Sequence, residues 1–103
     1  RDGFVSLDAG NTTGTLTTRP FQLPGGRLTV NVHPGKGGQL NIDLLDKNNK
    51  RLATSKPITT NQFGGTVEWA TGDPGKLTGQ TVSLRLRFRR ARLYSYWFQP
   101  PAG

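Results

Sequence analysis

TVSLRLRFRRARLYSYWF occupies residues 81–98, and its first half alternates strictly between apolar and polar side chains. Successive side chains of a β-strand point to opposite faces. The alternation predicts one apolar face, made of Val82, Leu84, Leu86 and Phe88. The opposite face begins at Ser83 and continues with three residues that we name the arginine ladder: Arg85, Arg87 and Arg89. The pattern predicts a strand that supplies a core on one side and presents guanidinium groups on the other.

Similar short alternating segments recur along the chain, each bounded by Gly, Pro, Asn or Asp. The segments predicted as strands are residues 4–7, 15–23, 27–33, 39–45, 50–54, 66–70, 80–89 and 92–98. No long window has the apolar spacing of an amphipathic helix. We therefore expect an all-β fold, an antiparallel β-sandwich (jelly roll) of about eight strands.

The connections between these segments predict how the strands pair. Residues 34–38 are rich in Gly, which predicts a reversal that makes 27–33 and 39–45 a hairpin. Residues 90–91 are expected to turn the chain into the last strand. Residues 55–65 have no regular pattern and are predicted to form a surface loop.

Length and composition restrict the class of protein. The 103 residues are enough to bury a core, and the absence of Cys excludes disulfides and a thiolate zinc site. The longest apolar run is too short for a transmembrane helix, so no membrane partner is expected. The first residues lack the pattern of a signal peptide. We expect residues 1–103 to be a single β-sandwich domain excised from a larger multidomain protein.

The charge of the chain is positive and unevenly distributed. The formal net charge is +8, and residues 81–103 contain five basic and no acidic side chains. Such a surface attracts nucleic acid, acidic polysaccharide or lipid headgroups through a salt-sensitive interaction. Charge alone does not choose among these partners.

The acidic residues do not favour catalysis. They are Asp2, Asp8, Asp43, Asp46, Glu68 and Asp73. Four of them lie in Gly- or Asn-bordered turns, where Asp makes local hydrogen bonds, which leaves Asp43 and Glu68 as a pair that could face one surface. Polar residues on the solvated face of a sheet are ordinary, so the sequence predicts no enzyme.

No cofactor is predicted either. His33 is the only histidine, which excludes a multi-histidine metal site. Asp8 with nearby loop carbonyls could hold a structural calcium ion, but an Asx-turn explains Asp8 equally well.

The arginine ladder has two interpretations. Three guanidinium groups on one strand face repel one another unless anions or acidic neighbours meet them. In the first interpretation, Asp43 and Glu68 form cross-strand ion pairs with the ladder. In the second, the ladder recognises hydroxyl, carboxylate or sulfate groups by forked hydrogen bonds.

The facing of the last strand is ambiguous from the sequence. If Tyr94, Tyr96 and Phe98 point inward, Trp97 lies on the other face, beside the arginine ladder. With the opposite facing, Trp97 belongs to the core and the tyrosines line the surface. Aromatic rings beside arginines suit sugar stacking, and they also suit single-stranded nucleic acid.

Several segments together resemble a known kind of domain. They are GFVSLDAG at 3–10, LTTRPFQL followed by PGGRLTVNV at 16–32, LNIDLLD at 40–46 and VSLRLRFRRARLYSYWF at 82–98. As a set they resemble the small jelly-roll domains appended to bacterial glycoside hydrolases and sialidase-like secreted proteins. The resemblance implies a non-catalytic, carbohydrate-binding-module-like domain. It also implies an extracellular or periplasmic location, beside a catalytic glycoside hydrolase domain in the parent chain.

We therefore predict a monomeric carbohydrate-binding module that binds a polysaccharide on the polar face of one sheet, with the charge favouring an anionic polymer. The predicted site consists of Arg85, Arg87, Arg89 and Trp97, with Asn41, Asp43 and Glu68 on neighbouring strands and Tyr94 and Tyr96 as further aromatics. Two alternatives remain: a purely structural accessory domain that packs on a neighbouring glycoside hydrolase domain, and a single-stranded nucleic-acid binder. The second has no recognised motif in its favour.

Overall fold

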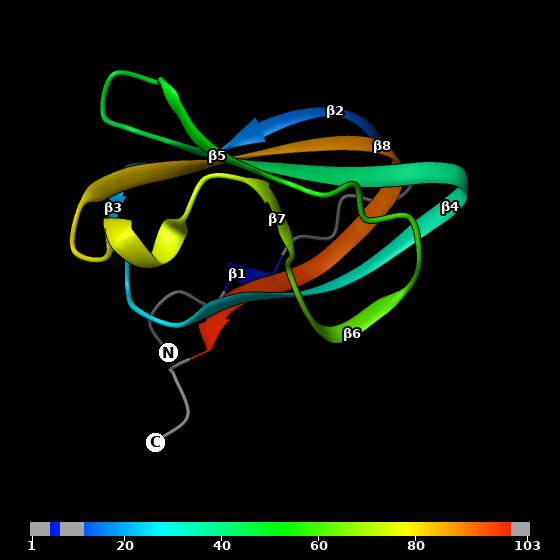
Figure 1. Cartoon of the computed structure of the whole chain (residues 1–103). Helices are drawn as coiled ribbons and strands as arrows, with labels where there is room; N and C mark the ends of the chain where they lie inside the picture. The colour runs from blue at the N-terminus through cyan, green and yellow to red at the C-terminus, as the bar shows by residue number, and fades with distance from the viewer. Residues whose placement is uncertain (1–4, 7–11, 100–103) are drawn as a thin grey trace.

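The computed structural model describes residues 5–6 and 12–99, with side chains from residue 14 onward, and this part of the chain is almost entirely β-structure (Figure 1). The eight strands are β1 (Val5–Ser6), β2 (Thr12–Thr17), β3 (Phe21–Gln22), β4 (Arg27–Leu45), β5 (Arg51–Ser55), β6 (Gln62–Thr66), β7 (Trp69–Thr71) and β8 (Thr81–Gln99). One short 3-10 helix, η1 (Pro74–Leu77), precedes β8. Every strand pair is antiparallel. The expected all-β antiparallel sandwich of about eight strands is confirmed.

Two long strands, β4 and β8, organise the whole domain. Each has 19 residues, and they pair with each other along nearly their full length. Both bend sharply at mid-length, so that the paired ribbon folds over on itself (Figure 1). We call the half that contains residues 39–45 and 81–89 the upper layer, and the half that contains 27–33 and 92–99 the lower layer.

Shorter strands extend the two layers at their edges. The central order is β1-β8-β4-β5-β7. In the upper layer β2 pairs with β8 and β5 pairs with β4. In the lower layer β1 pairs with β8 and β6 pairs with β4. The sandwich therefore consists of one continuous sheet that is folded over at the bend.

The predicted hairpin between 27–33 and 39–45 is wrong, because these segments are the two halves of β4. Each half pairs with β8: Val30 lies opposite Tyr96, and Ile42 lies opposite Leu86. A hairpin would have paired the two halves with each other. Residues 34–38 redirect the strand from one layer to the other without reversing it.

The predicted turn at 90–91 is likewise a bend within one strand, β8. Arg90 has a φ of 48°, in the left-handed region, and four residues of β4 are bulged between Pro34 and Gln39 at the same point of the ladder. A Cβ at Gly38 would lie 2.3 Å from the carbonyl oxygen of Arg90. The close approach of the two strands at the bend therefore requires glycine at position 38.

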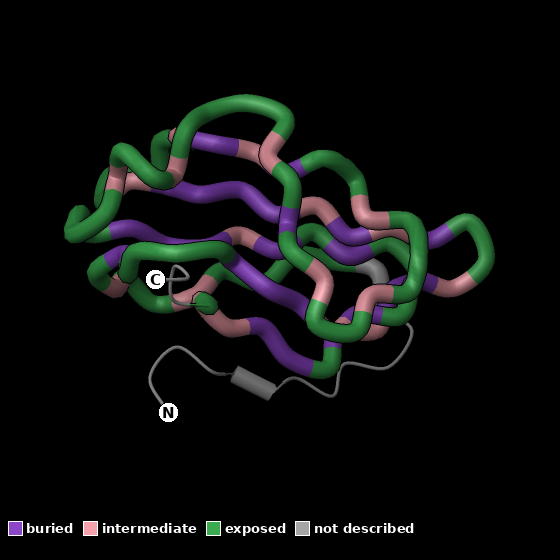
Figure 2. Tube along the Cα trace, turned by 60° about the horizontal axis from the view of Figure 1, so that its bottom comes forward, coloured by how far each residue is buried: buried purple, intermediate pink, exposed green. Residues whose placement is uncertain are grey.

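The core lies between the two layers, and Figure 2 shows its buried segments running along the central strands. The predicted inward face of the opening stretch is confirmed: Val82, Leu84 and Leu86 are fully buried, and Phe88 is nearly so. The facing residues of β4 belong to the same cluster: Leu28, Val30, Val32, Leu40, Ile42 and Leu44. Burial of each aliphatic side chain contributes about 1.5–3 kcal/mol, so this cluster holds the layers together.

A bulge in β8 decides the facing of the last strand. Val32 of β4 lies opposite Leu93 of β8, and the neighbouring Asn31 lies opposite Ser95. Tyr94, between Leu93 and Ser95, is therefore the extra residue of a bulge in β8. The bulge shifts the alternation by one residue, and both Leu93 and the later Tyr96 point inward.

Neither predicted facing therefore describes the whole strand. Tyr96 is 6% exposed and belongs to the core, whereas Tyr94 is 39% exposed. Trp97 lies opposite Thr29, one residue beyond the inward Tyr96, on the outer face of the lower layer.

Three smaller differences concern the edges. The segment 15–23, predicted with an internal Pro20, is divided into β2 and β3. The predicted loop 55–65 includes the start of β6, and the strand expected at 66–70 is β7, at Trp69–Thr71.

Within the described part of the chain, no helix is long and apolar enough to span a membrane.

Candidate ligand-binding site on the arginine face

The outer face of the upper layer brings the arginine ladder together with polar residues from three neighbouring strands. We call it the arginine face. Its first row across the sheet is Thr17, Arg85, Asp43 and Thr54, and its second row is Thr15, Arg87 and Asn41. Arg89 continues the ladder opposite Gln39. The sequence-based prediction that Asn41 and Asp43 lie beside the ladder is confirmed by this register.

Asp43 is the centre of the arginine face, and its side chain is fully buried beneath two guanidinium groups. Arg85 Nε donates to Asp43 Oδ2 at 3.0 Å, and Arg85 Nη2 lies 2.9 Å from the same oxygen. Arg87 Nη2 donates to Oδ1 at 3.1 Å, while its Nε lies 3.1 Å from Oδ2. The Thr54 hydroxyl also donates to Oδ1. We call this group of four residues the Asp43 clamp.

The clamp keeps the carboxylate ionised. Burial by itself raises the pKa of Asp43, but the Thr54 hydrogen bond and the charges of Arg85 and Arg87 outweigh it, and the pKa is lowered below 3.8. The carboxylate is therefore a permanent negative charge at neutral pH, and the two arginines leave one net positive charge on the clamp.

The clamp also fixes the direction of the two guanidinium groups. Both use the Nε and Nη2 side of the fork for Asp43, which leaves the Nη1 side for other partners. The side chains of Arg85 and Arg87 are 35% and 43% exposed. The face thus presents two oriented donor groups, and holding them in place before a ligand arrives lowers the entropy that binding must overcome.

The ion-pair interpretation of the ladder is right for Asp43 and wrong for Glu68. Glu68 lies beyond the end of β6, with its Oε2 4.0 Å from Lys56 Nζ, and both side chains are largely exposed. It does not belong to the arginine face. Such an exposed pair contributes about 0–1 kcal/mol.

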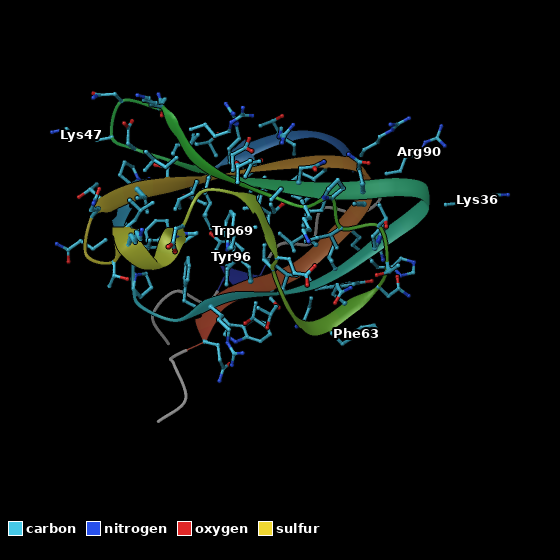
Figure 3. All side chains as sticks on the ribbon, viewed as in Figure 1. Lys36, Lys47, Phe63, Trp69, Arg90 and Tyr96 are labelled. Atoms are coloured by element: carbon cyan, nitrogen blue, oxygen red, sulfur yellow. The ribbon has the colours of Figure 1, made fainter. Side chains whose placement is uncertain are left out.

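Positive charge continues from the ladder to the bend. Arg89 and Arg90 are exposed, and Figure 3 shows Lys36 and Arg90 projecting from the bend where the ribbon folds over. Two of the described acidic residues, Asp46 and Asp73, accept hydrogen bonds from backbone N–H groups of their own turns. The arginine face therefore continues into a basic end of the domain.

The aromatic residues predicted for the site lie elsewhere. Trp97 is on the outer face of the lower layer, where its Nε1 donates to Gln99 Oε1 at 3.2 Å. Tyr94 lies in the bulge, with the Arg92 guanidinium 6.0 Å from its ring centre. Tyr96 is in the core, and burial raises its pKa. The expectation that Trp97 lies beside the ladder is wrong because the bend turns the second half of β8 into the other layer.

Two features of the surface had no signal in the sequence. Thr54 completes the Asp43 clamp, and only the register of β5 against β4 brings it there. Phe63 is 79% exposed on β6, and Figure 3 shows it pointing away from the core. Phe63 lies in the segment 55–65, for which the sequence predicts a surface loop.

Other candidate chemistry does not assemble in the described part of the chain. Among residues 12–99, no three His, Cys, Asp or Glu side chains are grouped in a way that could hold a metal ion. His33 is exposed beside the bend, opposite Arg92. Asp8, the residue considered for calcium, lies outside the described residues.

The fold and the face together define an all-β sandwich with an oriented, positively charged sheet surface. Comparisons with protein-family models, with curated proteins and with solved structures found no match to this chain.

Proposed function

We propose that this domain is a non-catalytic carbohydrate-binding module that binds an acidic polysaccharide through the arginine face. Its ligand would carry carboxylate or sulfate groups along a chain of sugar hydroxyls. The resemblance to accessory domains of secreted glycoside hydrolases supports a role outside the cytoplasm, next to a catalytic domain that acts on the same polymer.

The observation that carries this proposal is the Asp43 clamp. A buried carboxylate holds Arg85 and Arg87 in fixed orientations while both arginine side chains remain partly exposed. Guanidinium groups match carboxylate and sulfate oxygens by paired hydrogen bonds, and a fixed guanidinium loses less entropy on binding than a flexible one. Arg89 and the basic end of the domain add attraction for a repeating anion.

Binding on this face relies on hydrogen bonds and charge, without ring stacking. In the described strands of the upper layer, the aromatic residue next to the ladder is Phe88, which points into the core. Single-stranded nucleic acid gains about 1–3 kcal/mol per base from stacking on aromatic side chains. The arginine face supplies no such platform, which favours polysaccharide over nucleic acid.

Affinity electrophoresis in gels that contain polygalacturonate, a sulfated galactan or neutral dextran tests the proposal. We expect the wild-type domain to be retarded by one of the acidic polymers and not by dextran. Arg87→Lys keeps the charge but loses the forked hydrogen bonds, so we expect about tenfold weaker binding. Circular dichroism of the variant controls for folding.

A matched pair of variants separates the face from overall charge. Arg89→Ala and Lys47→Ala each remove one positive charge, and Figure 3 shows Lys47 at the end of the domain opposite the bend. We expect only Arg89→Ala to weaken binding beyond the small effect of net charge. The proposal fails if both variants bind equally weakly, if a single-stranded oligonucleotide binds more tightly than every polysaccharide, or if no polymer retards the wild type.

A further inference from the structure

A cleft of about 350 Å³ opens at one edge of the sandwich, away from the arginine face. One wall is the segment 56–60 and the other is the segment 62–68, with Val30 at the base. The first wall is attached to the upper layer through Ile58, and the second is attached to the lower layer through β6. The volume falls within the range of about 300–1,000 Å³ that is usual for small-molecule sites.

Backbone hydrogen bonds hold both walls of the cleft in place. Ile58 and Leu40 exchange two bonds of 2.9 Å, and the Lys56 N–H donates to the Glu68 carbonyl at 2.8 Å. On the other wall, the Val67 N–H donates to the Leu28 carbonyl at 2.9 Å. The cleft is therefore formed before any ligand enters it, which lowers the entropic cost of binding.

Gln62 is one of the residues that line the cleft. Its Nε2 donates to the Thr60 hydroxyl at 2.9 Å, at the point in the chain where the two walls join. A Cβ at Gly65 would lie 2.1 Å from Gln62 Oε1, so the side chain folds over a position that only glycine leaves open. From the outer side, Asn31 Oδ1 accepts from the Gly64 N–H at 2.6 Å and holds the strand that carries Gln62.

The lining is mainly polar, with a small apolar part and no net charge. Pro57 and Ile58 supply the apolar surface, and Val30 is almost fully buried. The remaining wall residues have hydroxyl or amide groups or belong to one oppositely charged pair. That pair is Lys56 and Glu68, whose Nζ and Oε2 atoms are 4.0 Å apart and whose opposite charges cancel. A pyranose ring has the matching properties, since it has an apolar C–H face, a rim of hydroxyl groups and no charge.

We propose that this cleft binds a single neutral pyranose residue. The apolar face of the ring lies on Pro57 and Ile58, and its hydroxyl groups bond to Gln62, Thr60 and Glu68. This site is separate from the arginine face and takes an uncharged ligand, so it goes beyond the proposed function and does not depend on it.

NMR titration of the ¹⁵N-labelled domain with neutral methyl glycosides of glucose, galactose, mannose and xylose tests the inference. We expect at least one of them to cause saturable shifts in the amides of residues 56–68, while those of residues 85–89 remain unchanged. Gln62→Ala removes the amide from the lining of the cleft, and we expect about fivefold weaker binding. Gln22→Ala is the matched control, because Gln22 is exposed on β3 and does not line the cleft.

A second variant keeps the test decisive if Gln62→Ala does not fold. Gly65→Ala displaces the Gln62 side chain without deleting it, and we expect the same loss of binding with the remaining spectrum unchanged. The inference is overturned if none of the four glycosides gives saturable shifts in the cleft. It is also overturned if Gln62→Ala and Gln22→Ala bind equally well, or if methyl glucuronide binds in the cleft more tightly than every neutral glycoside. None of these outcomes concerns binding of acidic polymers to the arginine face.

Discussion

The two outer faces of the sandwich are built by the same two strands, yet their chemistry differs. On the upper layer, Asp43 lies opposite Arg85 and forms a charged clamp. At the matching place on the lower layer, Asn31 lies opposite Ser95, and its Nδ2 donates to Ser95 Oγ at 2.9 Å. One face is held by ions and the other by neutral hydrogen bonds.

The reason for this difference lies in the bend. β4 and β8 each cross from one layer to the other, so one alternating strand supplies outward side chains to two opposite surfaces. The charged part of β8, residues 85–89, precedes the bend, and the outward Trp97 follows it. Neighbouring segments of the sequence therefore occupy opposite faces, and a site that combines them does not form.

The largest expected effect comes from removal of the charge that distinguishes the upper face. Asp43→Ala leaves Thr54 without its acceptor and two close arginines without their counter-ion. We expect the free energy of unfolding to fall by about 2–4 kcal/mol, because these charged hydrogen bonds are lost. The loss is not larger because the partly exposed arginines recover some hydration. Urea denaturation measures this loss. Asp46→Ala, in an exposed turn, is the control, and an equal loss in both variants would contradict a special role of the clamp.

The bend that separates the two faces is tested at Gly38. Gly38→Ala places a methyl group against the Arg90 carbonyl, where backbone atoms leave no room. We expect a loss of about 1–3 kcal/mol in unfolding free energy, measured by urea denaturation. At Gly25, the nearest atom to an added Cβ is 3.8 Å away, so Gly25→Ala should be nearly neutral. If Gly38→Ala is as stable as the wild type, the bend does not depend on this close approach.

The neutral hydrogen bonds of the lower face should contribute less than the clamp. Asn31→Ala removes the bond to Ser95 and leaves the Gly64 N–H, which is close to solvent, without its side-chain acceptor. We expect a loss of about 1–2 kcal/mol by the same measurement. A larger loss than in Asp43→Ala would reverse the ranking of the two faces.

The smallest effect is a dependence on pH that only the upper face should show. The pKa of Asp43 is lowered by folding, so its contribution to stability is fully present above 3.8 and is lost as the pH falls through the lower folded value. The difference in unfolding free energy between wild type and Asp43→Asn should be constant from about pH 7 to pH 5 and should shrink below pH 3.8.

The matched measurement is the same difference for Asn31→Ala, which should not change over this range because Asn31 and Ser95 do not titrate. Parallel pH curves for the two variants would show that the clamp does not lower the pKa of Asp43.

Local sequence patterns predicted where the strands lie better than they predicted which strands pair with each other. The period of two in residues 82–88 correctly assigned the buried and the arginine-bearing faces, and it placed Asn41 and Asp43 on the correct side of their strand. The glycine-rich segment 34–38 led to the wrong prediction of a hairpin, because the same residues allow either a reversal of the chain or a bend within one strand. The choice between them depends on which strand pairs with each half, and that is a long-range property.

The candidate site was predicted in part. The arginine ladder and Asp43 follow from alternation and from opposite charge. Thr54 and the separation of Trp97 do not, because they depend on the register of β5 and on the bend of β8. The bulge at Tyr94 has no mark in the sequence, and it alone brings both Leu93 and Tyr96 to the core.

The sequence by itself determined that this protein is an all-β domain whose last strand has one apolar and one arginine-bearing face. Side-chain alternation is a local property of an extended chain, and it needs no knowledge of the partner strand. Only the tertiary structure decided that β4 and β8 are single bent strands, that Asp43 is buried beneath Arg85 and Arg87, and that the predicted aromatic residues lie away from the arginine face. These features depend on contacts between residues more than forty positions apart, which are set when the two strands pair and the ribbon folds over its core.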